Sequence, residues 1–144
     1  MLEDRFAYLS MSLLFMLAWA FVYWKSPWKR GMVQVGFIGG IMGVIAEVWY
    51  FRDYWRPPTL MGEGIASIED FIIGFALFGV GGYIHSAFTK REVDTEKFSP
   101  PKNRDLFILF VLGCSSLTIF SIGLGIHSGY VTFLTFFCLS VYIW

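Results

Sequence analysis

Residues 6–24 read FAYLSMSLLFMLAWAFVYW, nineteen positions without a charged side chain. A helix of this length, rising about 1.5 Å per residue, crosses the roughly 30 Å hydrocarbon core of a bilayer. A surface helix of a soluble domain would carry a charged face, and this stretch carries none. Residues 6–24 therefore predict a transmembrane helix. Because residues 2–5 (LEDR) lack the basic region of a signal peptide, we expect the helix to be retained.

Four further apolar stretches follow along the chain of 144 residues, of which 56% are hydrophobic and 15% charged. Three of these stretches reach the length that crosses a bilayer, and the last is shorter. The expected spans are Phe6–Trp24, Gly31–Phe51, Ile65–Phe88, Asp105–Ile126 and a partial one from Tyr130 to Trp144. The predicted fold class is all-α, a polytopic transmembrane helix bundle with four complete spans plus a partial fifth.

Lysine and arginine are unevenly distributed over the predicted loops. The N-terminus and the second loop hold only Arg5, Arg52 and Arg56, whereas eight basic residues follow the first and third spans. Loops rich in Lys and Arg stay in the cytoplasm, so we expect an integral protein of the cell membrane with its N-terminus outside. The zero net charge and the lack of a basic block argue against nucleic acid as a partner. The eight are Lys25, Lys29, Arg30, Lys90, Arg91, Lys97, Lys102 and Arg104.

Three acidic residues, Glu47, Glu69 and Asp70, fall inside predicted spans and at similar depth near one membrane face. A carboxylate toward the middle of a membrane helix costs about 2.5 to 3.5 kcal/mol, so such residues usually face protein or water. Glu47 shares one helical stripe with glycines of its own span and is expected to point into the bundle. On the third span, Asp70 shares a stripe with two glycines and Glu69 shares one with Ile73, Ala76 and Val80, so the pattern does not choose between the two acids.

Carboxyl groups among apolar side chains suggest acid–base chemistry. Such a group can hold its proton near neutral pH and act as an acid, and a second carboxyl can act as the base. Ring faces beside it can stabilise a cation. In one alternative, the acids pair with Arg52 and Arg56 and cap helix ends; in another, the rings form an interfacial aromatic belt. The rings in question belong to Trp49, Tyr50, Phe51, Tyr54 and Trp55.

The histidines, cysteines and glycines of the chain predict neither a metal site nor a cofactor. His85 and His127 are expected near opposite membrane faces, which makes a shared metal site improbable. Cys114 and Cys138 lie in apolar runs and are interpreted as small apolar residues. The glycines between 36 and 43 have the spacing of helix packing, not that of a phosphate-binding loop.

The segment Ser67–Phe75, SIEDFIIGF, resembles the Pro-x-Glu-(Glu/Asp)-x-x-Phe signature of the lycopene cyclase domain, a small integral membrane family of heterodimers or fused halves. Residues Glu47–Pro58, EVWYFRDYWRPP, look like those of prokaryotic members that are mostly uncharacterised. The resemblance covers roughly Gly31–Arg91. Ser67 stands at the position of the motif's proline, where Ser-x-x-Asp is also a helix-capping pattern.

The resemblance implies cyclisation of the ends of a linear C40 carotenoid, an isomerisation without net redox change and without a cofactor. Glu69 would be the essential acid, Asp70 its acidic neighbour and Phe71 the aromatic residue of the signature. Glu47 is added because of its depth and facing. The aromatic residues between 49 and 55, with Phe71, would then contact the substrate.

Family members work as paired three-helix halves, which implies a domain organisation. Residues 1–91 would form one half, 92–104 a cytoplasmic linker, and 105–144 the start of a second half that the sequence does not complete. The expected partners are membrane lipid, a linear carotenoid, and a partner half or a second copy of the chain. The alternative function is a non-catalytic membrane-complex subunit or a carotenoid-binding scaffold. A small transporter ranks lowest, because the chain has no inverted repeat with matching broken helices.

Overall fold

The computed structural model describes residues 2–53, 56–60, 62, 66–89 and 103–143. These residues form helices and connecting segments, and no strand occurs among them. The all-helical class predicted from the sequence is confirmed for this part of the chain. The elements are α1 (Leu2–Lys25), α2 (Lys29–Asp53), α3 (Ile68–Thr89), α4 (Asn103–Ser116), the π-helix η1 (Leu117–Gly123) and α5 (Ser128–Ile143).

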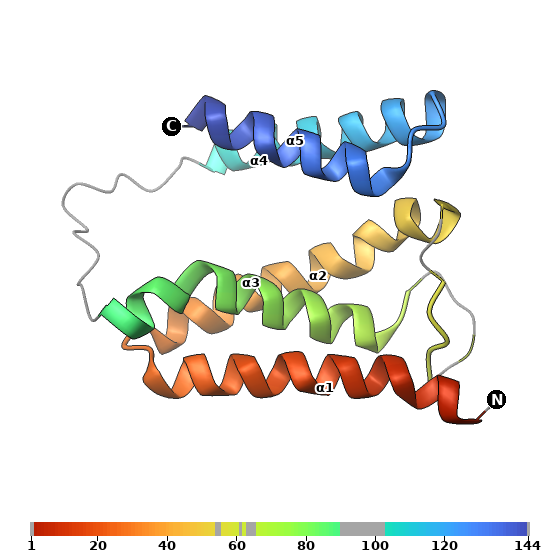
Figure 1. The fold of residues 1–144 in the computed structure, drawn as a ribbon. Helices are drawn as coiled ribbons and strands as arrows, with labels where there is room; N and C mark the ends of the chain where they lie inside the picture. The colour runs from red at the N-terminus through yellow and green to blue at the C-terminus, as the bar shows by residue number, and fades with distance from the viewer. Residues whose placement is uncertain (1, 54–55, 61, 63–65, 90–102, 144) are drawn as a thin grey trace. The chain divides into compact units, whose positions relative to one another are not determined.

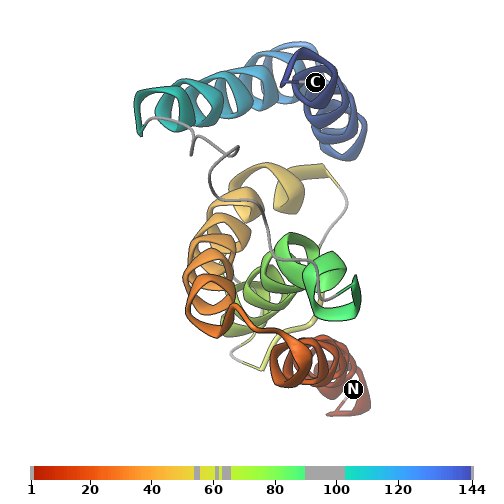
Figure 2. The same cartoon turned by 90° about the vertical axis from the view of Figure 1, so that its left-hand side faces the viewer.

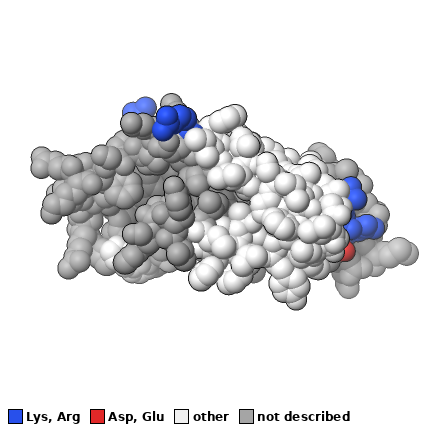
Figure 3. Space-filling model, turned by 90° about the horizontal axis from the view of Figure 1, so that it is seen from above, with Lys and Arg blue, Asp and Glu red and all other residues white. Residues whose placement is uncertain are grey.

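Three helices in the described part of the chain are long and apolar enough to cross a membrane, namely Phe6–Lys25, Lys29–Asp53 and Ile68–Phe88. They coincide with the first three expected spans. Many large apolar side chains on them are exposed, Leu17 and Ile38 among them. On the one face that Figure 3 shows, the described residues are mostly uncharged, with a few Lys, Arg and acidic atoms near the two ends. Such a surface is that of a membrane protein, because lipid rather than water solvates it.

The remaining helices are shorter. The expected fourth span is divided between α4 and η1, and α5 has 16 residues. The π-helix ends at Gly123, and Gly125, two residues later, has the left-handed conformation that is common just after a helix end, with φ 68°. The expected linker 92–104 lies outside the described residues except for its last two.

The chain divides into two compact units. The first comprises Met1–Val48 with Trp55–Val93, and the second comprises Trp49–Tyr54 with Asp94–Trp144. Helix α2 therefore contributes its last turn to the second unit. In the first unit the chain runs along α1, back along α2 and forward again along α3, so α1 and α3 point the same way (Figure 1). Figure 2 shows these three helices nearly end on, as a small bundle in which α1 packs against α3.

Small residues allow α2 and α3 to approach closely. A Cβ atom at Gly43 would lie 2.6 Å from the carbonyl oxygen of Asp70, and one at Gly36 would lie 3.0 Å from that of Phe75. On α3, a Cβ atom at Gly74 would meet the backbone of Gly39. The glycine spacing that predicted close packing thus marks the α2–α3 contact.

In the second unit, α4, η1 and α5 pack against one another. The end of α2 joins this group through hydrogen bonds. The indole Nε1 of Trp49 donates to the Thr118 hydroxyl at 3.3 Å, and the hydroxyls of Tyr50 and Thr132 are 2.7 Å apart. The Asp53 carboxylate accepts from the backbone N–H of Ser128 at the start of α5.

Candidate functional site

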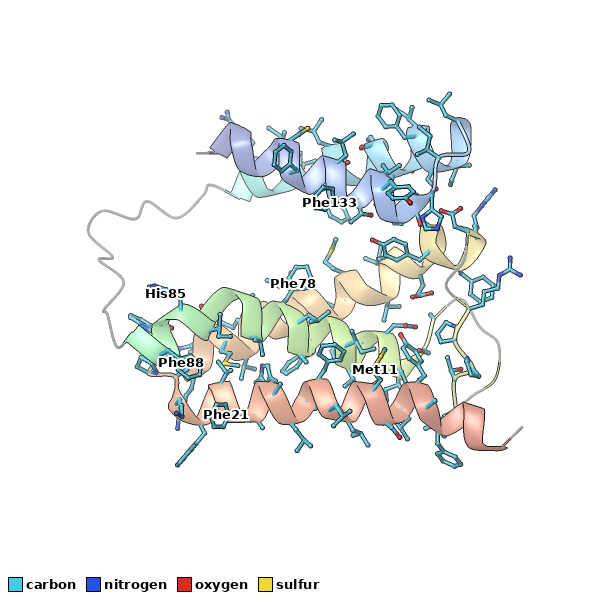
Figure 4. All side chains as sticks on the ribbon, viewed as in Figure 1. Met11, Phe21, Phe78, His85, Phe88 and Phe133 are labelled. Carbon is cyan, nitrogen blue, oxygen red and sulfur yellow. The ribbon has the colours of Figure 1, made fainter. Side chains whose placement is uncertain are left out.

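The three acids predicted from the sequence lie at the same end of the first unit. Glu69 and Asp70 are in the first turn of α3, and Glu47 lies six residues before the end of α2. Figure 1 shows that α1 begins, α2 ends and α3 begins at this end, where Figure 4 labels Met11 of α1. All three side chains are buried, with exposed fractions of 5% for Glu47, 0% for Glu69 and 5% for Asp70. We call these three residues the acid cluster.

Asp70 is held by hydrogen bonds to both of its carboxyl oxygens. Its Oδ1 accepts from the hydroxyl of Tyr8, which lies on α1. Its Oδ2 accepts from the backbone N–H of Ser67 at 3.0 Å and from the Ser67 hydroxyl at 2.6 Å. The Asp70 N–H in turn donates to the Ser67 hydroxyl at 3.2 Å. This reciprocal pair is a capping box, so the capping alternative applies to Asp70.

Glu47 brings α2 into the same network. Its carboxyl group, in the protonated form, donates a hydrogen bond to the carboxylate of Asp70. Its burial agrees with the direction predicted from the glycines of its helix. Asp70 is thus the point where side chains of α1, α2 and α3 meet.

Glu69 differs sharply from its neighbour. Its Oε1 accepts from the backbone N–H of Leu60, at 2.9 Å, in the segment between α2 and α3. Its Oε2 is buried and has no hydrogen-bond partner among the described residues. The segment is held by Thr59, whose hydroxyl donates to the carbonyl of Gly62, while the Gly62 N–H donates back to the Thr59 carbonyl at 3.1 Å. Gly62 has φ 97°, a conformation that suits glycine in such a turn.

The predicted aromatic residues that the structure describes are divided between the two units. Trp49 and Tyr50 make their hydrogen bonds within the second unit, and Phe51 is half-buried. Tyr54 and Trp55 lie outside the described residues. Phe71 packs in the first unit, where its ring is 5.6 Å from that of Phe37 and 6.2 Å from that of Phe75, measured between centroids.

Sequence reasoning missed Tyr8. A single tyrosine near the end of an apolar helix is usually an interfacial residue, so the position of Tyr8 by itself does not connect it with the acids. One signal was present: Ser12 follows four residues later, so both polar groups lie on one face of an otherwise apolar helix. In the structure Tyr8 is 5% and Ser12 0% exposed, and the Ser12 hydroxyl donates to the Tyr8 carbonyl at 2.8 Å.

The histidines and cysteines stay apart from the acid cluster. His85 lies on α3 at its far end (Figure 4), and His127 lies just before α5. Cys114 and Cys138 are free thiols. Within the described residues, no group of three His, Cys, Asp or Glu side chains is arranged to hold a metal ion.

Comparison of the chain with protein-family models, with curated proteins and with solved structures found no match. The resemblance to the lycopene cyclase domain therefore stays a prediction from the motif residues.

Proposed function

We propose that this chain is a lycopene-cyclase-like membrane isomerase, which protonates the end of a linear carotenoid with Glu69 and closes a ring without net redox change. The proposal combines the Ser67–Phe75 motif with the burial of the acid cluster. Protonating an isolated double bond needs an acid shielded from water, because water would otherwise compete as the base and capture the cation.

The observation that carries the proposal is Oε2 of fully buried Glu69, which has no hydrogen-bond partner among the residues that the structure describes. Asp70 accepts three hydrogen bonds, which stabilise a negative charge on it. At Oε2 of Glu69, the described part of the chain offers no donor to stabilise a negative charge, whereas a proton there removes the charge. The two adjacent acids are therefore suited to different roles, Glu69 as proton donor and Asp70 as a fixed anion.

The proposed reaction balances within the substrate and the acid cluster. Glu69 Oε2 gives its proton to a terminal double bond and leaves a carbocation on the carotenoid. An internal double bond attacks this cation and forms the ring carbon–carbon bond. The attack moves the positive charge to a ring carbon. The Glu69 carboxylate then takes a proton from the neighbouring carbon, which forms a new double bond and regenerates the acid. The negative charge of Asp70 stabilises the cation during this sequence.

In the membrane, we propose four complete spans plus a partial fifth, with the N-terminus outside the cell membrane. The acid cluster would then lie at the outer face. Following the paired halves that the resemblance implies, the chain would work with a partner half or with a second copy of itself.

The test is expression of the full chain in a bacterium that accumulates lycopene, followed by analysis of the extracted pigments. We expect cyclic carotenoid with the unchanged chain and, with Glu69→Gln, a decrease of about a hundredfold or more, the usual size of an acid catalyst's contribution. The matched control is Asp53→Asn, the same acid-to-amide change at an exposed residue. Absence of cyclic pigment while the protein is present in the membrane would refute a cyclase that works with a second copy of itself.

A second candidate is a non-catalytic subunit or carotenoid-binding scaffold. The hydrogen bonds of Asp70 favour it, because the capping box and the Tyr8 contact fully occupy this acid with holding helices together. For a scaffold, Glu69→Gln would leave the protein's co-purification with its complex unchanged. That outcome, with no pigment change, would select the scaffold.

A further inference from the structure

The turn that joins α1 to α2 carries a concentration of positive charge beside exposed tryptophans. Lys25, Lys29 and Arg30 lie within six positions, and all three are exposed. The side chains of Trp24 and Trp28 are 74% and 39% exposed. No acidic residue occurs between positions 6 and 46. We call Trp24–Arg30 the basic turn.

The basic turn is held in a defined shape. Ser26 is buried, its N–H donates to the Val22 carbonyl at 2.8 Å, and its hydroxyl accepts from the N–H of Trp28 at 3.1 Å. The Nζ of Lys25 lies 4.9 Å from the ring centroid of Phe21 and 5.3 Å from that of Phe88. Figure 4 shows Phe21 and Phe88 at this end of the first unit. The charge of Lys25 is therefore placed where α1 and α3 both end.

The positive charges at the start of α2 do not stabilise that helix. Lys29 and Arg30 stand in the first turn of α2, which contains no acidic residue. This is the positive end of the helix dipole, where cations are unfavourable and anions favourable. The rings near Lys25 and Lys29, with Tyr23 at 5.5 Å from the Lys29 Nζ, stabilise cations without neutralising them.

The short length of the basic turn keeps it near the membrane surface, where the available anions are lipid headgroups. Only three residues separate α1 from α2, both long and apolar enough to cross a membrane. Three residues reach about 10 Å at most, so the turn stays at the level of the lipid headgroups. Tryptophan favours this boundary, and basic residues next to it attract anionic lipid.

We propose that the basic turn binds the phosphate groups of anionic phospholipids, with Lys25, Lys29 and Arg30 contacting the headgroups and Trp24 and Trp28 at the boundary with the acyl chains. Bound lipid holds the ends of α1 and α3 together through Lys25 and its two rings. The inference does not depend on the proposed enzymatic function.

The experiment titrates the full purified chain, in neutral detergent, with phosphatidylglycerol and follows its thermal unfolding. We expect the unfolding temperature to rise with phosphatidylglycerol and not with phosphatidylcholine or inorganic phosphate. Replacing Lys25, Lys29 and Arg30 together by Gln should weaken the apparent affinity about a hundredfold, since each basic residue contributes about a fivefold factor.

The matched control replaces Arg52 and Arg56 by Gln, which removes charge elsewhere and should retain the phosphatidylglycerol response. Circular dichroism of each variant verifies that it is helical. An equal rise with phosphatidylcholine, or an unchanged phosphatidylglycerol response in the triple variant, would overturn the proposal. A rise with inorganic phosphate alone would overturn the assignment to lipid.

Discussion

Tyr8 connects α1 to the acid cluster through one hydroxyl group, so its contribution can be measured with one substitution. Tyr8→Phe keeps the ring and removes the donor to Asp70 Oδ1. A buried hydrogen bond to a charged group contributes about 1.5 to 3 kcal/mol, and we expect a loss of that size in the free energy of unfolding. Urea unfolding of the purified protein in detergent measures it.

Tyr130→Phe is the control for Tyr8→Phe, because the Tyr130 side chain is 74% exposed. Equal stability of the two variants would contradict the role assigned to the Tyr8 hydroxyl. In the lycopene assay, Tyr8→Phe should reduce ring formation less than Glu69→Gln, since Tyr8 positions Asp70 and does not touch the reacting atoms.

Residue patterns predicted the burial of Glu47 but not the difference between Glu69 and Asp70. The burial of Glu47 follows from its own helix, where glycines mark the packed face. The difference between the two neighbours depends on Tyr8, 62 positions before Asp70, and on the backbone N–H of Leu60. Helical periodicity contains no information on such partners. The residue pattern of the third span alone therefore cannot predict that Glu69 and Asp70 differ in their hydrogen bonds.

At the scale of elements, the α2–α3 contact depends on glycine at Gly74 but not at Gly81. A Cβ atom at Gly74 would meet the backbone of Gly39, whereas one at Gly81 would have nothing within 4 Å. We expect Gly74→Ala to lose about 1 to 3 kcal/mol of stability because the helices must separate. Gly81→Ala should be neutral or gain up to about 1 kcal/mol, because alanine favours helix.

Thermal unfolding of both glycine variants in the same detergent checks this pair. A Gly74→Ala protein as stable as Gly81→Ala would mean that the close approach of α2 and α3 does not contribute to folding. Because both changes add one methyl group to the same helix, effects on insertion or expression should be similar.

Other features of the elements were beyond prediction from the sequence. Trp49 lies about 200° around α2 from Glu47, at 3.6 residues per turn. Its hydrogen bond to Thr118 lies in the second unit, and the closeness of Trp49 to Glu47 in the sequence gives no sign of that partner. The sequence also does not predict the π-helix, because an extra residue in a helical turn leaves the apolar composition of the segment unchanged. Its register is visible only in bonds such as Leu124 N–H to the Ile119 carbonyl, at 3.1 Å.

At the scale of the whole molecule, the sequence predicted three apolar helices that the structure contains, because length and apolar composition are local properties. The number of spans beyond these three and the sidedness of the chain depend on the membrane and stay predictions. The distribution of Lys and Arg predicts the side of the membrane on which each loop lies. Because each crossing reverses that side, locating the loops tests both the number of spans and the orientation.

Insertion of a reporter that reveals its side of the membrane, at three positions of the full chain, tests the topology. Gly62 follows α2, Asn103 precedes the expected fourth span, and Gly125 follows η1 close to the end of that span. We expect the outside at Gly62, the cytoplasm at Asn103 and the outside again at Gly125. A reporter at Gly62 in the cytoplasm would reverse the orientation drawn from the basic residues. A reporter at Gly125 on the same side as Asn103 would show that α4 and η1 do not cross. The N-terminus serves as the control, because two crossings by α1 and α2 must return the chain to the side where it began.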